Sequence, residues 1–224
     1  LLPAVQEPAQ RLGIQIPLIT SNGSVLQYAN GQMIHAKYID PQVVHRIIQL
    51  VSPYEVDITV CTPLSVYTRR ITAGVRAMMD FGPPQPREIP SWEYLGGDVK
   101  QVIKLVLLNL NGPSALAPVA DILSRNLDGR VSCFPTMPYM LEVLPPGENK
   151  ASGLRRLADH LHIQLAEIIT IGDGDNDVVM HQQAGLSAAV VNGTPACRAS
   201  ADVLIDSNDH EGPARFLAGL LKSC

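Results

Sequence analysis

Residues 168–177 read Ile-Ile-Thr-Ile-Gly-Asp-Gly-Asp-Asn-Asp. An apolar run of strand length, Ile168 to Ile171, leads directly into three carboxylates within five residues, Asp173, Asp175 and Asp177. Carboxylates this close repel one another, and a hard cation is the simplest way to offset that repulsion, because Mg²⁺ and Ca²⁺ prefer oxygen ligands. The stretch therefore indicates a metal site at the carboxyl end of a strand.

Two other interpretations of the acidic stretch compete with a catalytic metal site. Its three carboxylates match the start of a calcium loop, but an EF-hand would need Gly at position 178 and Glu at position 184, where this chain has Val178 and Ala184. The calcium loop is therefore excluded. The other interpretation is a polar turn with Asp177 as the N-cap of the next helix. The position after a strand, where doubly wound sheets form their sites, favours a functional role.

Helices and strands alternate regularly around this stretch, from residue 150 onward. Leu154, Leu157 and Leu161 recur at helical spacing, and continuous apolar runs of strand length follow. This pattern is typical of a doubly wound α/β sheet, which binds ligands at the carboxyl ends of its strands. We predict strands at residues 168–171, 186–191 and 201–205, and helices at residues 150–161, 177–184, 194–199 and 211–221.

The pattern in the first 145 residues changes near residue 36. Residues 1–35 predict a helix and short strands, with Asn30-Gly31 as a hairpin turn. Residues 36–145 predict an α+β layout, with helices at 41–51, 65–79 and 114–126 and strands at 56–61, 102–109, 130–134 and 139–144. We therefore predict an α/β core of residues 1–35 and 146–224, with an inserted cap of residues 36–145.

Composition excludes several classes of protein. Hydrophobic residues make up 46% of the 224 residues and charged residues 17%, below the usual value of about 25%, so the chain has enough apolar surface to fold. A net charge of -4 argues against nucleic acid or an anionic membrane as the main partner. No apolar run reaches the roughly 18 residues that cross a bilayer. The four cysteines, Cys61, Cys133, Cys197 and Cys224, show no Cys-x-x-Cys spacing, which favours free thiols in a reducing cytoplasm.

Residues 172–180, Gly-Asp-Gly-Asp-Asn-Asp-Val-Val-Met, resemble the fourth signature motif of the haloacid dehalogenase (HAD) superfamily, particularly of its Cof-type phosphatases in subclass IIB. Those proteins carry Gly-Asp-Gly-x-Asn-Asp followed by two apolar residues and Met. Residues 18–24, Leu-Ile-Thr-Ser-Asn-Gly-Ser, resemble the family segment that ends the strand before the cap, and Glu148-Asn149-Lys150 resembles its third motif. The resemblance implies a doubly wound, HAD-like (Rossmann-type) core with an inserted cap domain.

The activity that this resemblance implies is Mg²⁺-dependent hydrolysis of a phosphomonoester, such as a sugar phosphate or another small phosphorylated metabolite. In the family, an Asp nucleophile attacks the phosphate and a second Asp serves as acid and base, while a metal, a lysine and backbone amides stabilise the charge. By position, Asp173 would be a magnesium ligand and Asp177 an auxiliary catalytic carboxylate at the metal. Lys150 would pair with the nucleophile and with phosphoryl oxygens.

The resemblance also implies substrate contacts. Asn176 would lie on the phosphate side of the site, and Asn22 and Gly23 would border it. Taken alone, Lys150 is a solvated lysine at a helix start, and Asn22-Gly23 is a tight turn.

Two family motifs have no match in these 224 residues: the first, Asp-x-Asp-Gly-Thr, which holds the nucleophile, and the second, a Thr-Gly-Arg sequence. By this resemblance, the chain is expected to begin just after the family's second motif. We therefore expect the 224-residue chain to be inactive by itself. The alternatives are a regulatory or phosphate-binding protein without the nucleophile, and an interaction module whose cap surface binds a partner.

Overall fold

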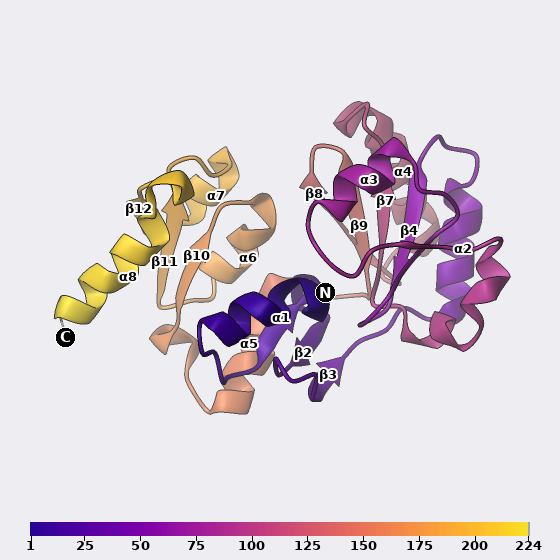
Figure 1. The fold of residues 1–224 in the computed structure, drawn as a ribbon. Coiled ribbons are helices and arrows are strands. Elements are labelled where there is room, and N and C mark those ends of the chain that lie inside the picture. The colour runs from indigo at the N-terminus through magenta and orange to yellow at the C-terminus, as the bar shows by residue number, and fades with distance from the viewer. Residues whose placement is uncertain (224) are drawn as a thin grey trace. The chain divides into compact units, whose positions relative to one another are not determined.

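The computed structural model describes residues 1–223, so Cys224, expected to be a free thiol, lies outside the described residues. The chain forms two compact units, Leu1–Glu148 and Asn149–Cys224. Three separate sheets lie in them: two in the first unit and one in the second (Figure 1). The predicted grouping of residues 1–35 with residues 146–224 stays a prediction.

The second unit is an α/β alternation around a parallel sheet of order β10-β11-β12. Gly172, at the end of β10, pairs with Ala189 of β11, and Ala189 pairs with Leu204 of β12. Parallel neighbours need crossover connections, and helices supply them here. The predicted alternation is confirmed, with α5 (Lys150–Leu161), β10 (Ile169–Gly172), α6 (Val178–His181), β11 (Leu186–Val190), α7 (Pro195–Ser200), β12 (Val203–Ile205) and α8 (Gly212–Ser223).

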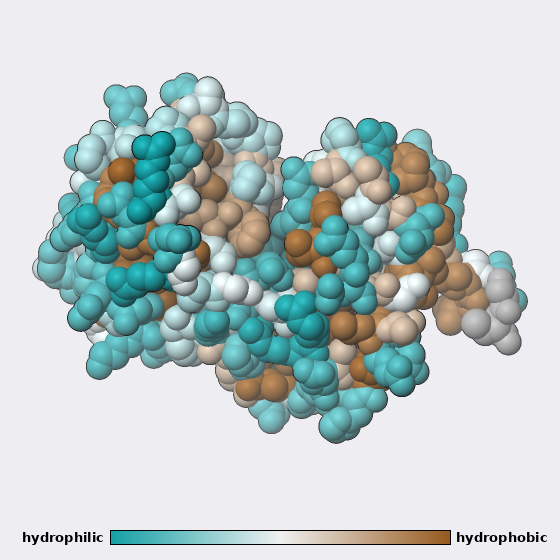
Figure 2. Space-filling model, turned by 180° about the vertical axis from the view of Figure 1, so that it is seen from behind, coloured by the Kyte–Doolittle hydropathy of each residue, from teal (hydrophilic) through white to brown (hydrophobic). Residues whose placement is uncertain are grey.

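Several large apolar side chains of this unit remain on its surface. The central strand β11 is covered, since Ala188 and Ala189 are fully buried, whereas Ile169 of the edge strand β10 is 41% exposed. Leu204 of β12 and Leu221 of α8 are exposed as well, and Figure 2 shows hydrophobic surface along this end of the chain. The parallel sheet therefore has little apolar cover on its outer strands.

The small sheet of the first unit is antiparallel, in the order β1-β2-β3. The predicted hairpin at Asn30-Gly31 joins its last two strands, and Gly31 has a φ of 91°, a left-handed conformation that favours glycine. Its elements are α1 (Leu2–Arg11), β1 (Leu18–Thr20), the 3₁₀ turn η1 (Ser21–Gly23), β2 (Val25–Gln27) and β3 (Met33–Ala36).

The large sheet has six strands in the order β6-β5-β4-β7-β9-β8. Leu105 and Leu107 of its strand β7 pack in one buried cluster with α2 and α4, while Val106 and Leu108 pack in a second cluster. This period of two gives the sheet one face covered by α2 and α4 and an opposite face. The elements are α2 (Pro41–Val51), β4 (Asp57–Cys61), β5 (Val66–Thr68), α3 (Ala73–Met79), β6 (Arg87–Glu88), η2 (Trp92–Gln101), β7 (Lys104–Leu108), α4 (Pro113–Leu127), β8 (Ser132–Met137) and β9 (Met140–Leu144).

The helix predicted over residues 65–79 is wrong in its first half. Residues 66–68, Val-Tyr-Thr, form β5, which pairs with β4 on one side and with β6 on the other. The helix begins only at Ala73, where Thr72 Oγ1 accepts a hydrogen bond from Val75 N at 3.2 Å. Cross-strand pairing on two sides outweighed a helical spacing that the local sequence also allowed.

The two chain segments that enter and leave residues 36–145 are tied together. Lys37 Nζ donates to the carbonyl oxygen of Pro146 at 2.6 Å and lies 3.5 Å from Glu148 Oε1. Glu148 is 1% exposed, so this ion pair fixes both segments near the predicted domain crossings. None of the helices within residues 1–223 has the length and apolar content that a bilayer crossing requires.

Candidate functional site

The predicted site loop follows β10 directly and turns back under its own strand. Gly172 ends the strand, residues 175–177 form a 3₁₀ turn, and α6 begins at Val178. A Cβ at Gly172 would lie 2.5 Å from the Cβ of Asp177 and 2.8 Å from His181 Nε2. Only glycine at this position lets the Asp177 side chain fold back beneath the loop.

The Asp177 carboxylate holds this loop to the start of α5. Its Oδ2 accepts hydrogen bonds from the backbone N–H groups of Asp173 and Gly174, both at 3.0 Å, and its Oδ1 accepts one from Lys150 Nζ. Asp177 is 2% exposed. Both carboxylate oxygens therefore serve to position the loop and the lysine.

These contacts lower the pKa of Asp177. Burial by itself would raise the pKa of this carboxyl, but the Lys150 ammonium and the amides of Gly174 and Asp173 more than offset burial. A folded-state pKa below the unfolded value contributes stability above the unfolded value, and that stability is lost as the pH falls through the folded pKa.

We expect Asp177→Asn to reduce the acid sensitivity of folding. The asparagine cannot be protonated, so the free energy of unfolding should fall less in the variant than in the wild type between about pH 5 and pH 2. Urea unfolding at each pH measures this. Asp202 and Asp206 also have lowered pKa values, through Ser187 and Ser207 respectively, but both remain in each protein, so the difference reports Asp177. Identical pH curves would contradict the assigned role of the carboxylate.

Lys150 is placed by a well-formed helix start. Asn149 is the N-cap of α5: its Oδ1 accepts from Ser152 N at 2.9 Å, and Ser152 Oγ accepts from Asn149 N at 3.1 Å. A lysine in the first turn is unfavourable for the helix dipole, and Asp177 offsets that cost. The Lys150 side chain is 30% exposed, so part of it remains accessible from the surface.

The loop after β11 packs against the site loop. Thr194 N donates to the carbonyl oxygen of Asp173 at 2.8 Å, and Thr194 Oγ1 donates to Asp175 Oδ1 at 2.6 Å. A Cβ at Gly193 would lie 2.9 Å from the Asp173 carbonyl oxygen, so glycine allows the close approach. The ends of β10 and β11 thus form one rigid platform that carries the exposed Asp173 side chain.

The oxygen donors of the platform suit Mg²⁺ only in part. Within residues 1–223, no three His, Cys, Asp or Glu side chains gather in a way that could hold a metal. Magnesium usually takes one or two carboxylates and completes its shell with water and substrate phosphate, so an exposed Asp173 fits as one ligand. The predicted metal role of Asp177 stays a prediction, and its oxygens already accept three hydrogen bonds.

The predicted substrate-binding residues lie in both units. Asn176 is half-buried in the site loop, beside Gly174, whose added Cβ would lie 2.9 Å from Asn176 Oδ1. Asn22 and Gly23 belong to the first unit, where Asn22 has a left-handed φ of 51° and its Nδ2 donates to Glu142 Oε2 at 2.8 Å. Lys150, Asp173, Asn176 and Asp177 are therefore brought together, while Asn22 and Gly23 belong to a different compact unit.

His181, to which the sequence pattern assigns no role, is buried beside Gly172 at the end of β10. His181 is 3% exposed, its Nδ1 is 3.0 Å from Ser200 Oγ, and burial lowers its pKa despite the nearby carboxylates of Asp177 and Asp202. The spacing of four residues from Asp177 is the signal that places both on one side of the helix start. This histidine packs between α7, through Ser200, and the end of β10, at Gly172.

Comparison with known families identifies the family of the chain. Residues 2–217 match the haloacid dehalogenase-like hydrolase family. The chain belongs to this family. The assignment of Lys150 to the third motif and of residues 172–177 to the fourth motif stays a prediction.

Two curated relatives each match a part of this HAD-like chain. The endoribonuclease YBEY of Arabidopsis thaliana chloroplasts is 47% identical over 75 residues, which are 34% of this chain and 13% of that protein. The 5-amino-6-(5-phospho-D-ribitylamino)uracil phosphatase YitU of Bacillus subtilis is 32% identical over 125 residues, 56% of this chain and 45% of that protein. The chain thus spans less than half the length of both relatives in these matches.

The fold also matches solved structures. A haloacid dehalogenase-like hydrolase from Bacteroides thetaiotaomicron superposes with a TM-score of 0.85 at 23% identity, covering 97% of this chain and 82% of that one. This match shows the predicted α/β, HAD-like fold over nearly the whole described chain.

Proposed function

We propose that this chain acts in a Mg²⁺-dependent phosphatase that hydrolyses the phosphomonoester of a small metabolite. The observation that carries the proposal is the contact between Lys150 and Asp177 at the end of β10, in a chain of the HAD-like family. The name of the Bacillus subtilis relative, a phosphatase of a phosphorylated ribitylaminouracil, supports a small phosphorylated substrate. The ribonuclease activity in the name of the Arabidopsis relative is not part of this proposal, because the match covers 13% of that protein.

Each described residue has a distinct task in this proposal. Lys150 donates to Asp177 and offers its remaining N–H donors to phosphoryl oxygens. Asp177 orients Lys150 and holds the amides of residues 173 and 174, so the loop needs no reorganisation when substrate binds. Asn176 contacts the phosphate side. The nucleophilic Asp belongs to the family's first motif, which has no match in residues 1–224.

Asp173 is the residue of this platform that we propose as a magnesium ligand. When bound, the metal ion supplies positive charge that stabilises the transferring phosphoryl group. The chain's own contribution is to fix Asp173 through the hydrogen bond of Thr194 N to its carbonyl oxygen, while its carboxylate stays exposed.

We expect Asp173→Asn to weaken magnesium dependence in a form of the chain extended upstream with the family's first and second motifs. Losing one hard oxygen ligand should raise the half-saturating Mg²⁺ concentration and lower kcat, each by about tenfold or more. Turnover of p-nitrophenyl phosphate across a Mg²⁺ titration measures both quantities.

Asp175→Asn is the matched control for that experiment, because it removes the same charge two residues away. Asp175 is exposed and accepts a hydrogen bond from Thr194, which an asparagine oxygen can also accept. Its kcat and magnesium titration should stay within about threefold of the parent. Equal effects of the two substitutions would contradict the metal role of Asp173.

We further propose that residues 36–145 act as the cap of this enzyme and residues 1–35 and 146–224 as its core, in a cytoplasmic protein. Helices cover one face of the six-stranded sheet within residues 36–145. The contacts of Lys37 with Pro146 and Glu148 support a defined pivot where the chain crosses from the cap to the core. Exchange of residues 36–145 for a related cap should change the preferred phosphate ester.

A further inference from the structure

The three carboxylates of the site loop differ in how they are held. Asp177 is buried and accepts three hydrogen bonds. Asp175 is exposed, and its Oδ1 accepts one hydrogen bond, from Thr194 Oγ1 at 2.6 Å. The Asp173 carboxylate is exposed, and in the described part of the chain no hydrogen bond or ion pair holds it. Asp173 is therefore the carboxylate of this loop that is open to a cation.

The Thr194 hydroxyl group acts as acceptor and as donor. Its oxygen accepts from Cys197 N at 3.3 Å as the N-cap of α7. Its single hydrogen goes to Asp175 Oδ1, because an ionised carboxylate oxygen can only accept. The 2.6 Å distance is typical of a charge-assisted O–H···O⁻ bond, which is about twice as strong as a bond between neutral groups. The hydroxyl group therefore fixes the position of the Asp175 carboxylate.

Thr194 contacts Asp173 as well as Asp175. Its backbone N–H donates to the carbonyl oxygen of Asp173 at 2.8 Å. A Cβ at the preceding residue, Gly193, would lie 3.2 Å from Asp173 Cα. Both acidic residues therefore lie where the loop after β11 meets the site loop. Carboxylates two residues apart can bind one ion, as those at the first and third positions of a calcium loop do.

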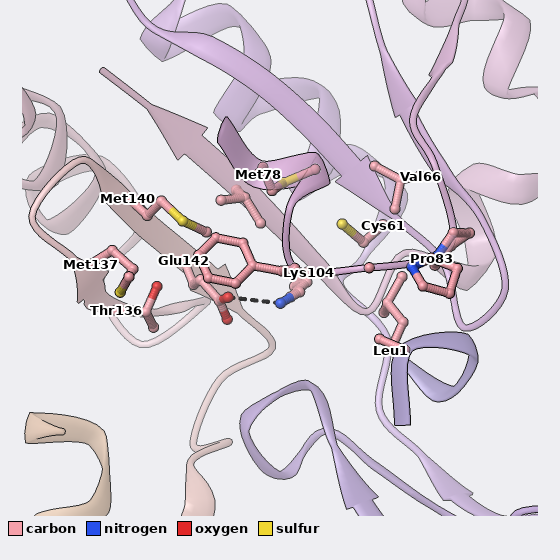
Figure 3. Close-up of a pocket in the computed structure, with 15 residues that line it drawn as sticks. Leu1, Cys61, Val66, Met78, Pro83, Lys104, Thr136, Met137, Met140 and Glu142 are labelled. Carbon is pink, nitrogen blue, oxygen red and sulfur yellow. Dashed lines mark hydrogen bonds and ion pairs between the residues drawn. The ribbon is translucent and has the colours of Figure 1, made fainter. Parts of the chain in front are cut away.

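A hydroxyl group holds a carboxylate without cancelling its charge. Figure 3 shows the other case in the first unit, where Glu142 Oε1 lies 2.7 Å from the ammonium nitrogen of Lys104. That contact pairs a negative charge with a positive one. Asp175 bonds a neutral partner instead, so it keeps its negative charge and would attract a cation once it was released.

The number of free carboxylates affects which divalent cation a site favours. Mg²⁺ keeps several of its waters and is usually bound through one or two carboxylates, whereas Ca²⁺ takes six to eight oxygen ligands in a flexible shell. With Asp175 held, the loop offers the carboxylate of Asp173. A second free carboxylate two residues away would add charge and oxygen ligands, which favours Ca²⁺ more than Mg²⁺.

We propose that Thr194 determines the cation selectivity of this site: its hydroxyl group holds Asp175 away from an ion at Asp173 and so disfavours Ca²⁺. The inference rests on the proposed magnesium role of Asp173 and adds a specificity-determining residue from outside the site loop. The spacing of the three carboxylates matches the start of a calcium loop, and Thr194 keeps two of them from acting together as one.

The test is a Ca²⁺ titration of the ¹⁵N-labelled 224-residue chain, followed by NMR, for the wild type and for Thr194→Val. Valine keeps the shape of threonine and lacks the hydroxyl group, so Asp175 is released. We expect the amide shifts at residues 173–176 to saturate at a Ca²⁺ concentration about fivefold or more lower in the variant. The matching change for Mg²⁺ should stay within about twofold. Equal Ca²⁺ affinity of the two proteins, or an equal gain for both ions, would overturn the proposal.

Two variants separate the freed carboxylate from the lost helix cap. Thr194→Ser keeps the hydroxyl group and should bind Ca²⁺ as the wild type does. Thr194→Val/Asp175→Asn lacks the same cap but frees no charge, so its Ca²⁺ affinity should return to within about twofold of the wild type. A double variant that keeps the tighter binding would contradict the proposal. If Thr194→Val does not fold, Thr194→Gly takes its place, because glycine is a tolerated N-cap without a hydroxyl group.

The form extended with the family's first and second motifs provides a second readout. Ca²⁺ should inhibit the Mg²⁺-dependent turnover of its Thr194→Val variant at a concentration about fivefold lower than that of its parent. Unchanged inhibition in an active variant would contradict the proposal. The titration of the 224-residue chain needs no turnover, so an inactive extended form would contradict the phosphatase function, while the titration still decides the role of Thr194.

Discussion

Lys150→Met, in a form of the chain that carries the family's first and second motifs, should lower kcat by about 10²–10³-fold. Lys150 places a positive charge next to the loop of residues 172–177, and a backbone amide cannot replace a lost ammonium at the phosphoryl oxygens. Its Nζ contacts Asp177, which in turn holds the amides of Asp173 and Gly174. Steady-state kinetics with p-nitrophenyl phosphate at saturating Mg²⁺ measure the loss.

Arg155→Met is the matched control, because it removes a positive charge from the same helix on an exposed residue whose side chain bonds Gln183. We expect its kcat to stay within about threefold of the parent. Lys150→Arg should recover part of the activity, since it restores the charge but not the shape. An equal drop in kcat for Lys150→Met and Arg155→Met would contradict a catalytic role of Lys150. A drop that is explained entirely by a lower melting temperature would assign Lys150 a purely structural role.

Gly185→Ala should destabilise the second unit by about 3–5 kcal/mol. Gly185 N donates to the carbonyl oxygens of Leu165 and Ile168, both at 3.0 Å, which draws the start of β11 onto the preceding turn. A Cβ at this position would lie 1.8 Å from the carbonyl oxygen of Ala166. That atom belongs to the backbone, so relief requires moving a chain segment that positions β10.

Gly219→Ala is the control for this glycine, because its added Cβ in α8 meets no described atom within 4 Å apart from its chain neighbours and the backbone of its own helix. Alanine is the better helix former, so this variant should be unchanged or stabilised by up to about 1 kcal/mol. Urea unfolding followed by circular dichroism compares the two. A loss below about 1 kcal/mol for Gly185→Ala would show that the turn adapts to the methyl group.

Sequence alone predicted the parts of the molecule that local patterns specify. An apolar run, two glycines and an acidic helix start predict the strand, glycine-rich loop and helix of residues 168–181. The structure adds the contact between Lys150 and Asp177. The helix at residues 41–51 was also predicted with its observed bounds, because Asp40 and Pro41 are strong start signals.

Features that depend on long-range pairing escaped sequence analysis. Strand β5 pairs with residues 59–61 and 87–88. The sequence of β5 and its immediate neighbours does not indicate this pairing. The pairing of Lys104 with Glu142 depends on the register between β7 and β9, and the only signal was one charge inside each of two apolar strands. The burial of His181 likewise needs α7, which supplies Ser200.

We propose that the platform of Lys150, Asp173 and Asp177 stabilises phosphoryl transfer and requires the nucleophile of the family's first motif. Phosphatase assays of the 224-residue chain and of its extended form, each with and without Mg²⁺, test this most directly. We predict Mg²⁺-dependent turnover of p-nitrophenyl phosphate by the extended form and none above background by the 224-residue chain. Equal turnover by both forms, or an extended form that is folded and inactive with Mg²⁺, would contradict it.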